Sequence, residues 1–430
     1  MGSVGGTTGG RALIAHVERW LPVGQSRRTG SGILRLPLPE LDVWLLLLTL
    51  ALCGLGLIMV YSSSQALAYT DYGNPAYFFD RQLLWLAMGL VGLVVCAKID
   101  YHRWIQLAPA LSIVTLLLLV AVLVPHIGYE VQGARRWIYF GSFDLQPSVL
   151  AQFLVVVAGA VWLDRLGPRI TDLRDGVLNY SWKILVVALL VVMEKDLGSA
   201  VVLAITALGL LWLAGVRIRH LAGLGLAVLV GGLLLVRAEP YRTTRLLSYL
   251  NPFAHKLGSG FQAVQALYSL GAGGIFGTGL NGAVSPSQLL PEAHTDFIFA
   301  IIGEELGLIG TLLVLLLFLG FAWRGIRAAR NAPDRLGVLL AGGVTIWIVG
   351  QALINIGGVT DTIPSTGVPL TFISYGGTSL ALSLAATGIL LNISARQRRV
   401  GIGNARANHG GRNGRSLHPS HRGGGGSEAD

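Results

Sequence analysis

Ten apolar segments, most of them near the length needed to cross a lipid bilayer, constrain the fold of this chain more than any other feature. Of its 430 residues 53% are hydrophobic and 13% charged, whereas an ordinary soluble domain carries about 25% charged residues. We therefore predict an all-α polytopic membrane protein with about ten transmembrane helices. The segments cover residues 42–62, 82–98, 104–124, 148–163, 182–193, 198–215, 221–236, 297–322, 336–357 and 373–393. The fifth is short and ends at MEKDLGSA, so a broken or re-entrant helix is an alternative there.

Basic residues near the segment ends predict the orientation, because cytoplasmic connections are enriched in Lys and Arg. If both termini are cytoplasmic, one side holds Arg27, Arg28, Arg35, Lys98, Arg103, Arg165, Arg169, Arg174, Lys183, Arg217, Arg219, Arg324, Arg327, Arg330, Arg335, Arg396, Arg398 and Arg399. We expect a cytoplasmic arm over 1–40, a transmembrane domain over 41–395 and a basic, disordered tail over 396–430. A long connection, 237–295, then lies on the outer face between the seventh and eighth helices, where amphipathic or re-entrant elements are expected.

Charge distribution, cysteine placement and the lack of nucleotide and zinc motifs argue against several classes of function. The net charge of +10 is explained by membrane topology, so no nucleic-acid partner is expected. The first 40 residues lack the pattern of a cleavable signal sequence, and Cys53 and Cys96 lie in apolar segments as packing residues. The chain has no Walker loop, dinucleotide fingerprint or HExxH motif. It must therefore act on a substrate already activated in the membrane, or transport one.

The segment LLPEAHTDFIFAIIGEELGLIG gathers acids at the outer mouth of the eighth span. Thr295 or Asp296 could serve simply as the N-cap of this helix. Capping does not explain Glu292, His294 and Asp296 together, and ionisable groups at a membrane entrance are usually functional. We therefore favour a catalytic or ligand-binding role for Asp296.

Two more acids, Glu304 and Glu305, lie roughly 12 Å deeper along the same helix. We interpret them as a buried supporting pair, satisfied by Arg or by helix-end amides, and keep direct catalysis as the alternative. Gly303, Gly307 and Gly310 predict close helix packing at this depth.

Basic residues on the outer side are candidates for binding an anion. Arg135 and Arg136 run against the usual charge bias of outer loops, which makes a phosphate ligand plausible beside the alternative of an aromatic belt. Arg242 and Arg245 share a helical face and suit phosphate binding or structural pairing equally.

The turn containing Glu194, Lys195 and Asp196 interrupts an apolar hairpin. We expect Asp196 to cap the sixth helix and leave the role of Lys195 open. In the last outer loop Asn355, Asp361, Ser374 and Tyr375 are expected to line a cavity open to the outer face.

These motifs resemble a known family. LPEAHTDFIFAIIGEELG (290–307) and ISYGGTS (373–379) are similar to signature segments of the SEDS proteins, the cell-shape, division and sporulation proteins RodA, FtsW and SpoVE. The similarity extends over GLIMVYSSS, GARRWI, QPS, KDLGSA, YRTTRLL and GGIFGTGL, and covers residues 42–395.

The resemblance implies a peptidoglycan glycosyltransferase that polymerises lipid II on the outer face of the bacterial cytoplasmic membrane, beside a class B penicillin-binding protein. It implies that Asp296 is essential, and a carboxylate there can accept the proton of an attacking sugar hydroxyl. Cationic groups must stabilise the departing pyrophosphate. The candidates are Arg135, Arg136, Lys195, Arg242 and Arg245, with Glu292, His294, Ser374 and Tyr375 as further substrate-binding residues and Asp196, Glu304, Glu305 and Asn355 as supports of the cavity. A divalent cation is left open as a cofactor, without a clear ligand set.

The chain departs from the family pattern at one informative place. The usual QPSExxK reads QPSVLAQ, with Val149 and Gln152 in place of the acid and the lysine. Both members of an ion pair are absent, so no lone charge is left behind.

Two alternatives remain. A lipid II flippase or other transporter would use Glu304 and Glu305 for proton coupling, although the charged groups concentrate on one face rather than at the midplane. A non-catalytic scaffold of the division or elongation machinery would explain the missing ion pair, but the retained Asp296 opposes it.

Overall fold

The apolar segments form helices, because in a bilayer only a helix or a closed barrel satisfies its own backbone groups. The computed structural model describes residues 41–412 except 132, 142, 256, 257, 259 and 283–292. Among these residues, nine helices are long and apolar enough to cross a membrane, and the apolar helix α7 (Leu197–Leu213) is shorter. The long helices are α2 (Val43–Tyr72), α3 (Tyr77–Lys98), α4 (Trp104–Leu123), α5 (Pro147–Leu166), α6 (Asn179–Met193), α8 (Ile218–Ala238), α11 (Ile298–Arg330), α12 (Arg335–Val359) and α13 (Gly377–Arg412).

The ten expected spans are thus confirmed as helices, with corrections at their ends. The fifth is not a broken or re-entrant segment, because a π-helical turn at Leu173–Leu178 leads directly into α6 and completes a span of full length. The last helix continues to Arg412, so the start of the tail is helical rather than disordered. The arm 1–40 and the remainder of the tail, 413–430, lie outside the described residues.

A small antiparallel sheet replaces the loop expected between the third and fourth spans. Its strands are β1 (Tyr129–Val131), β2 (Ala134–Phe140) and β3 (Phe143–Leu145), in the order β1-β2-β3. The run WIYF in β2 is rich in residues that favour strands. Successive side chains of a strand point to opposite faces, which separates neighbours such as Arg135 and Arg136.

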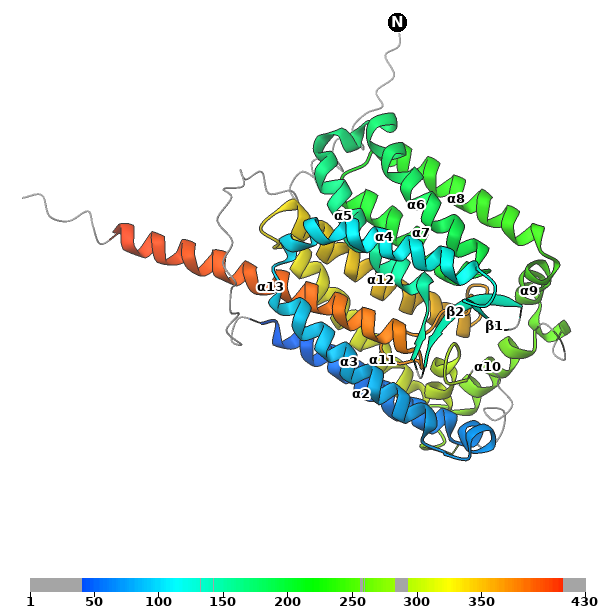
Figure 1. The fold of residues 1–430 in the computed structure, drawn as a ribbon. Coiled ribbons are helices and arrows are strands. Elements are labelled where there is room, and N and C mark those ends of the chain that lie inside the picture. Colours follow the sequence, from blue (N-terminus) through cyan, green and yellow to red (C-terminus); the bar gives the residue numbers. More distant parts are fainter. Residues whose placement is uncertain are drawn as a thin grey trace, which may run out of the picture.

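The long connection between α8 and α11 forms short elements, as expected. They are α9 (Pro240–Leu250), the 3-10 turn Pro252–His255 and α10 (Phe261–Ala272). We call the end of the bundle that carries β1–β3, α9 and α10 the sheet end; Figure 1 shows these elements together on one side.

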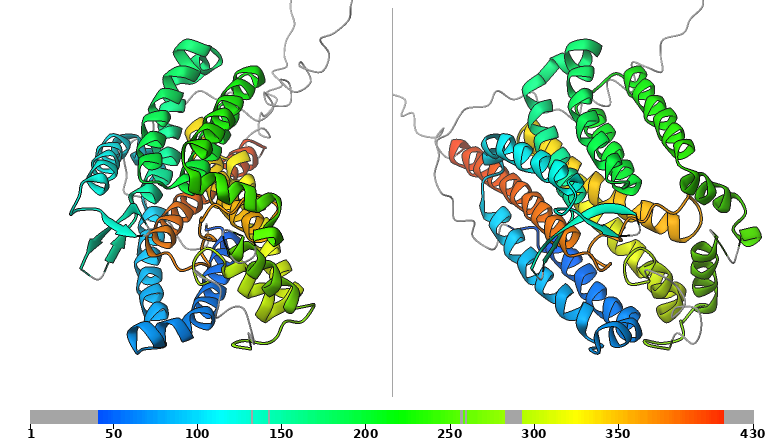
Figure 2. Two further views of the ribbon diagram at one scale, coloured as in Figure 1. Left: turned by 90° about the vertical axis from the view of Figure 1, so that its right-hand side faces the viewer. Right: turned by 45° about the vertical axis from the view of Figure 1, so that its right-hand side comes forward.

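Close helix packing brings the C-terminal part of the chain against the N-terminal part. Helix α13 lies along α3 (Figure 1), and a Cβ added at Gly388 would collide with the backbone of Leu93. Small residues at such crossings let helices approach closely within a membrane. The most buried spans are α5, α12 and α13, whereas α8 has no buried residue and lies on the outside of the bundle beside α7 (Figure 2).

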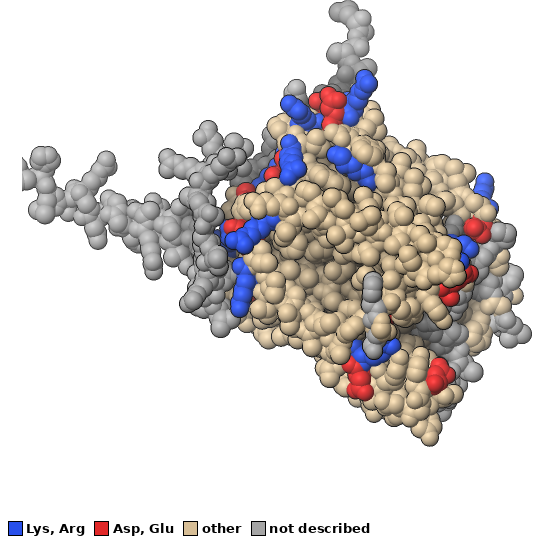
Figure 3. All heavy atoms as spheres, in the orientation of Figure 1, with Lys and Arg blue, Asp and Glu red and all other residues tan. Residues whose placement is uncertain are grey.

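Charged side chains lie mainly at the two ends of the bundle. Figure 3 shows Lys, Arg, Asp and Glu at two opposite edges of one face, with a broad uncharged band between them. At the end away from the sheet, Arg396 pairs with Asp100 at 2.6 Å, and His102 bridges Asp100 and Asp334. This distribution is the one expected of a protein whose middle section faces lipid.

Candidate active site

Asp296 lies at the sheet end, directly before α11, and its position is fixed from two sides. The side-chain amide of Asn355 on α12 donates hydrogen bonds of 2.7 Å to the backbone carbonyls of Asp296 and Val368. A Cβ added at Gly367, whose φ is +69°, would lie 3.2 Å from the Asp296 carboxylate. The glycine therefore lets the 360–376 connection pass close to the carboxylate. Asp296 itself is half-buried.

The N-cap interpretation of this segment was wrong. Helix α11 begins at Ile298 with Phe297 in the N-cap position, so neither Thr295 nor Asp296 occupies it. The Asp296 carboxylate lies one residue before the N-cap position and beside Gly367.

Aromatic rings surround His294, two residues before Asp296 on the same segment. His294 is buried, and its ring centroid lies 4.5 Å from that of Phe78 and 5.6 Å from that of Tyr375. The backbone N–H of Tyr375 donates to the carbonyl of His294 at 2.9 Å. The Ser374 hydroxyl accepts from the N–H of Leu370 at 2.8 Å, so it supports the loop. The structure therefore brings Tyr375 against His294, two residues before Asp296, although Tyr375 follows about 80 residues later in the sequence.

The start of α7 packs against the other side of the same loop. Asp196 is its N-cap, as expected, and accepts from the N–H of Ser199 at 3.0 Å. Its second oxygen accepts from the Ser148 hydroxyl at 2.9 Å and from the Gln146 amide at 3.1 Å. A Cβ added at Gly198 would collide with the carbonyl of Thr366, one residue before Gly367. The 194–196 turn and Asp296 thus flank one short loop.

Arg135 and Arg136 point in different directions from β2. Arg135 Nε lies 3.1 Å from a carboxylate oxygen of Glu130, its partner across the strands. Arg136 Nη2 donates to the carbonyl of Lys195 at 2.5 Å, and its Nε is buried without a hydrogen-bond partner among the described residues. Arg136, rather than Arg135, therefore belongs to the 194–196 turn.

Other candidate residues are only partly described. Lys195 is exposed at the turn, with a left-handed φ of +60°, and forms no ion pair within the described part of the chain. Arg242 and Arg245 lie on α9, but their side chains are outside the description, and Glu292 lies outside the described residues altogether.

Glu304 and Glu305 are both buried at a break in α11. The Ser62 hydroxyl of α2 lies 2.7 Å from both oxygens of the Glu305 carboxylate, and Oε2 of Glu304 has no hydrogen-bond partner in the described residues. Of the two expected kinds of partner, Arg or helix-end amides, the arginine does not appear, because the described ion pairs include none with either glutamate.

The break itself lies at Gly307, where φ is +68°. The backbone N–H groups of Thr278 and Gly279 donate to the carbonyls of Glu304 and Glu305, at 2.9 and 3.0 Å. The segment GGIFGTG is thus bound to the opened helix by backbone hydrogen bonds, which supports the interpretation of this region as structural.

Sequence analysis missed two charged residues at the sheet end. Arg81 on α3 donates to the Tyr77 hydroxyl at 2.7 Å and lies 3.6 Å from the carboxylate of Asp144 on β3. Burial raises the pKa of Asp144, and the Arg81 charge opposes that shift. Glu194, which the sequence placed in the 194–196 turn without a role of its own, is fully buried at the end of α6. No motif marked Arg81 or Asp144, because their pairing depends on the sheet that was expected to be a loop.

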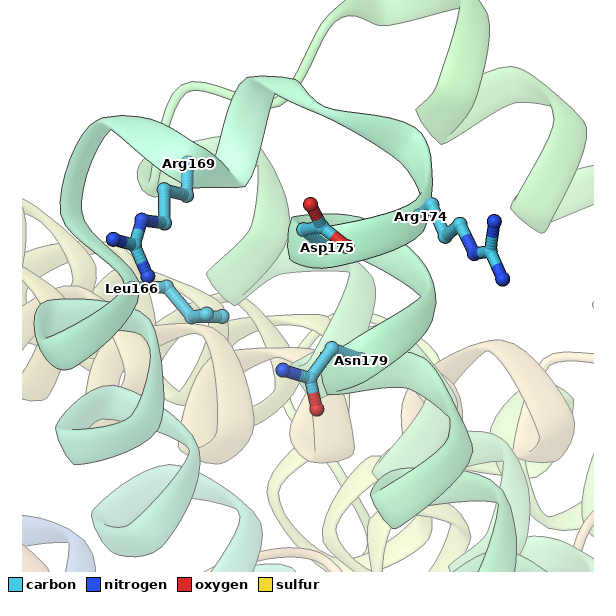
Figure 4. A pocket seen from close by; sticks show the side chains of 5 residues that line it. All are labelled: Leu166, Arg169, Arg174, Asp175 and Asn179. Carbon is cyan, nitrogen blue, oxygen red and sulfur yellow. The ribbon is translucent and has the colours of Figure 1, made fainter.

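A separate pocket lies at the end away from the sheet. It is lined by Leu166, Arg169, Arg174, Asp175 and Asn179 (Figure 4), none of which is a candidate site residue. Within the described ranges, no group of three or more His, Cys, Asp or Glu side chains is placed to hold a metal ion.

Comparison with known proteins now adds to this geometry. The family model of the FtsW, RodA and SpoVE cell cycle proteins matches residues 43–399. The chain belongs to this family. It is 42% identical over 357 residues to stage V sporulation protein E of Bacillus subtilis, covering 83% of this chain and 98% of that protein. It is also 41% identical over 365 residues to the probable peptidoglycan glycosyltransferase FtsW of Trichlorobacter lovleyi, covering 84% and 96%.

Solved structures of the family agree. A chain of a peptidoglycan synthase complex matches with a TM-score of 0.70 and 30% identity, covering 83% of this chain and 98% of that chain. The rod shape determining protein RodA of Thermus thermophilus matches with a TM-score of 0.61 and 28% identity, covering 83% and 97%. The multi-pass membrane fold is therefore that of the FtsW/RodA/SpoVE family.

The departure from the family pattern is accommodated in the core. Val149 and Gln152 on α5 are both buried, and Gln152 Oε1 accepts a 2.9 Å hydrogen bond from the indole N–H of Trp347 on α12. A neutral hydrogen bond thus stands where the family pattern has charges, and a buried polar group that is paired in this way costs little.

Proposed function

We propose that this chain is a peptidoglycan glycosyltransferase that polymerises lipid II at the outer face of the bacterial cytoplasmic membrane. The family membership and the curated names of its relatives support the activity. The observation that carries the mechanism is the placement of Asp296, a half-buried carboxylate held by Asn355 and given room by Gly367. With both termini in the cytoplasm, the sheet end faces outward, where lipid-linked sugars are polymerised.

The proposed reaction is an inverting transfer. A sugar 4-hydroxyl attacks the anomeric carbon of a lipid-linked sugar, and a new C–O bond forms as the bond to the diphosphate oxygen breaks. Asp296 accepts the hydroxyl proton, because a general base must lie within hydrogen-bond reach of the proton it takes. Undecaprenyl pyrophosphate leaves with the electron pair of the broken bond.

The leaving group requires positive charge close to it. Arg136 and Lys195 are our first candidates. Arg136 binds the carbonyl of Lys195, and the 194–196 turn flanks the loop that contains Gly367, as Asp296 does. Arg242, Arg245 and Glu292 remain candidates from the sequence. Arg135 is the weaker choice, because Glu130 already pairs with it. We derive no step through a divalent cation.

A class B penicillin-binding protein is the proposed partner. The structural relative from a peptidoglycan synthase complex supports this pairing, since that assembly coordinates polymerisation and crosslinking.

The decisive experiment reconstitutes the full chain with this transpeptidase and labelled lipid II. Wild type should form glycan polymer, Asp296→Ala should form none, and Asp71→Ala, which alters an exposed acid at the end of α2, should match wild type. Equal polymer from wild type and Asp296→Ala would remove Asp296 from catalysis. Movement of lipid II across liposomes without any polymer would favour a flippase, and binding of the partner with neither activity would favour a scaffold.

A further inference from the structure

Glu194 is the most unusual ionisable group at the sheet end. It follows α6 directly, its side chain is 0% exposed, and neither carboxylate oxygen has a hydrogen-bond partner among the described residues. Burying an ionised carboxylate without donors is very costly, whereas a neutral carboxylic acid tolerates such a place much better. The geometry therefore favours the protonated acid.

The charged neighbours of Glu194 come from two elements. Asp196 at the start of α7 and Arg136 on β2 both act on it, while Lys195 between the two acids is exposed. Helices α4 and α5, which also pack against α6, bring no charged side chain that shifts it. Burial first, and then the Asp196 charge, raise the pKa of Glu194 to about 9, and Arg136 opposes them.

Asp196 and Glu194 differ in their hydrogen-bond donors. Asp196 accepts hydrogen bonds from Ser199 N–H, the Ser148 hydroxyl and the Gln146 amide. A buried carboxyl group without such donors favours its neutral form. Glu194 has none of these donors. Of the two acids, Glu194 is the one that keeps its proton.

A protonated Glu194 leaves the Arg136 guanidinium without a carboxylate partner from this turn. Its guanidinium donates to the Lys195 carbonyl, a neutral acceptor, and its buried Nε is left without a partner in the described residues. An ionised Glu194 would be the natural counter-ion of that guanidinium. A neutral Glu194 leaves the positive charge of Arg136 without a carboxylate counter-ion from Glu194 and therefore available to another anion.

We propose that Glu194 is a positioning residue that stays protonated in the working protein and so keeps Arg136 available for the diphosphate of the lipid-linked sugar. The inference rests on the proposed function and deepens it, because it names the residue that controls the anion site. Glu194 neither gives nor takes a proton in the transfer itself. Its ionisation at alkaline pH instead closes the anion site by pairing with Arg136.

The test measures KM for lipid II against pH in the reconstituted complex. The diphosphate of lipid II is a diester of constant charge in this range, and the comparison with Glu194→Gln separates the effect of Glu194 from that of other titrating groups. For wild type we expect KM to rise at least about threefold between about pH 8 and about pH 10, with kcat changing less. Glu194→Gln, which mimics the neutral acid, should keep the neutral-pH KM of wild type throughout. Asp71→Asn, the exposed control, should retain the wild-type rise.

A second measurement does not depend on activity. Infrared difference spectra at neutral pH should show the carbonyl stretch of a protonated carboxylic acid in wild type and its loss in Glu194→Gln. An unchanged band in the variant, or the same alkaline rise in KM in wild type and variant, would overturn the inference. Wild type without any polymerase activity would overturn the proposed function instead, while the infrared result would still decide the protonation of Glu194.

Discussion

The side-chain amide of Asn355 binds the backbone carbonyl of Asp296, at 2.7 Å, and with its second N–H the carbonyl of Val368 at the same distance. One side chain on α12 thereby ties the segment before α11 to the loop that contains Gly367. The position of the proposed base therefore depends on a residue 59 positions away in the sequence.

Asn355→Ala should impair catalysis more than folding. Loss of both hydrogen bonds lets the Asp296 segment move, and misplacement of a reacting group by about 1 Å can cost about 10²-fold in rate. We expect kcat for polymerisation to fall by about 10- to 100-fold. Asn392→Ala is the matched control, because this buried amide also binds two backbone groups, Tyr101 N–H and the Ala97 carbonyl, but away from the site. A similar loss of kcat in both variants would show a general packing effect.

Gly367→Ala should reduce activity through a steric effect on Asp296. The new Cβ would lie 3.2 Å from the carboxylate, and the left-handed backbone would add strain of about 1–2 kcal/mol. Gly215→Ala carries the same backbone strain, at φ +86°, with no atom within 4 Å of the added Cβ. Thermal unfolding should shift alike in the two variants, and glycan synthesis should fall only in Gly367→Ala. Normal synthesis in both would show that the approach of the loop to Asp296 is not critical.

Gln152→Leu should destabilise the bundle. The change leaves the buried N–H of Trp347 without its acceptor, which costs about 1–3 kcal/mol. Thr115→Val is the control, since this hydroxyl is buried without a partner in the described residues and its loss should be almost neutral. Unfolding of the purified proteins in detergent measures both. Equal stability of wild type and Gln152→Leu would mean that the hydrogen bond contributes nothing.

Glu194 should make the stability of the protein fall as pH rises. Its pKa is about 9 in the folded protein against 4.5 ordinarily, so the folded state holds a proton that the unfolded state releases. The stabilising contribution is complete below about pH 4.5 and is lost progressively up to about pH 9, by up to about 1.4 kcal/mol per pH unit. Glu194→Gln should remove this component, so the difference in unfolding temperature between variant and wild type should grow with pH. A constant difference across that range would contradict the shift.

Much of the fold could be predicted from local composition. Ten apolar segments indicated ten helices, and the structure has them within a few residues of the expected ends, except at α2, α3, α11 and α13. The N-cap at Asp196 was also predictable, because an Asp directly before a helix is a preferred capping residue and is recognised from the neighbouring residues alone. Such features depend on hydrophobicity and on backbone groups within one turn.

The contacts that make the site required the tertiary structure. The pairing of Arg81 with Asp144 and the separation of Arg135 from Arg136 both depend on the sheet β1–β3. The pattern of apolar segments did not predict this sheet. The break at Gly307 forms because a distant segment, GGIFGTG, supplies backbone partners to the opened helix. Hydrogen bonds between segments far apart in the chain produce no periodic pattern of residues in the sequence, so they could not be predicted from it.

The sequence by itself therefore determined the membrane-spanning architecture and singled out Asp296, because both are expressed in the polarity of neighbouring residues. Only the tertiary structure decided which groups are paired. It gave Asp196 three donors, left Glu194 without one among the residues that the structure describes, and set Asn355 against the backbone of Asp296. Burial and hydrogen-bond partners control the charge of a carboxyl group, and both are set by the packing of distant helices.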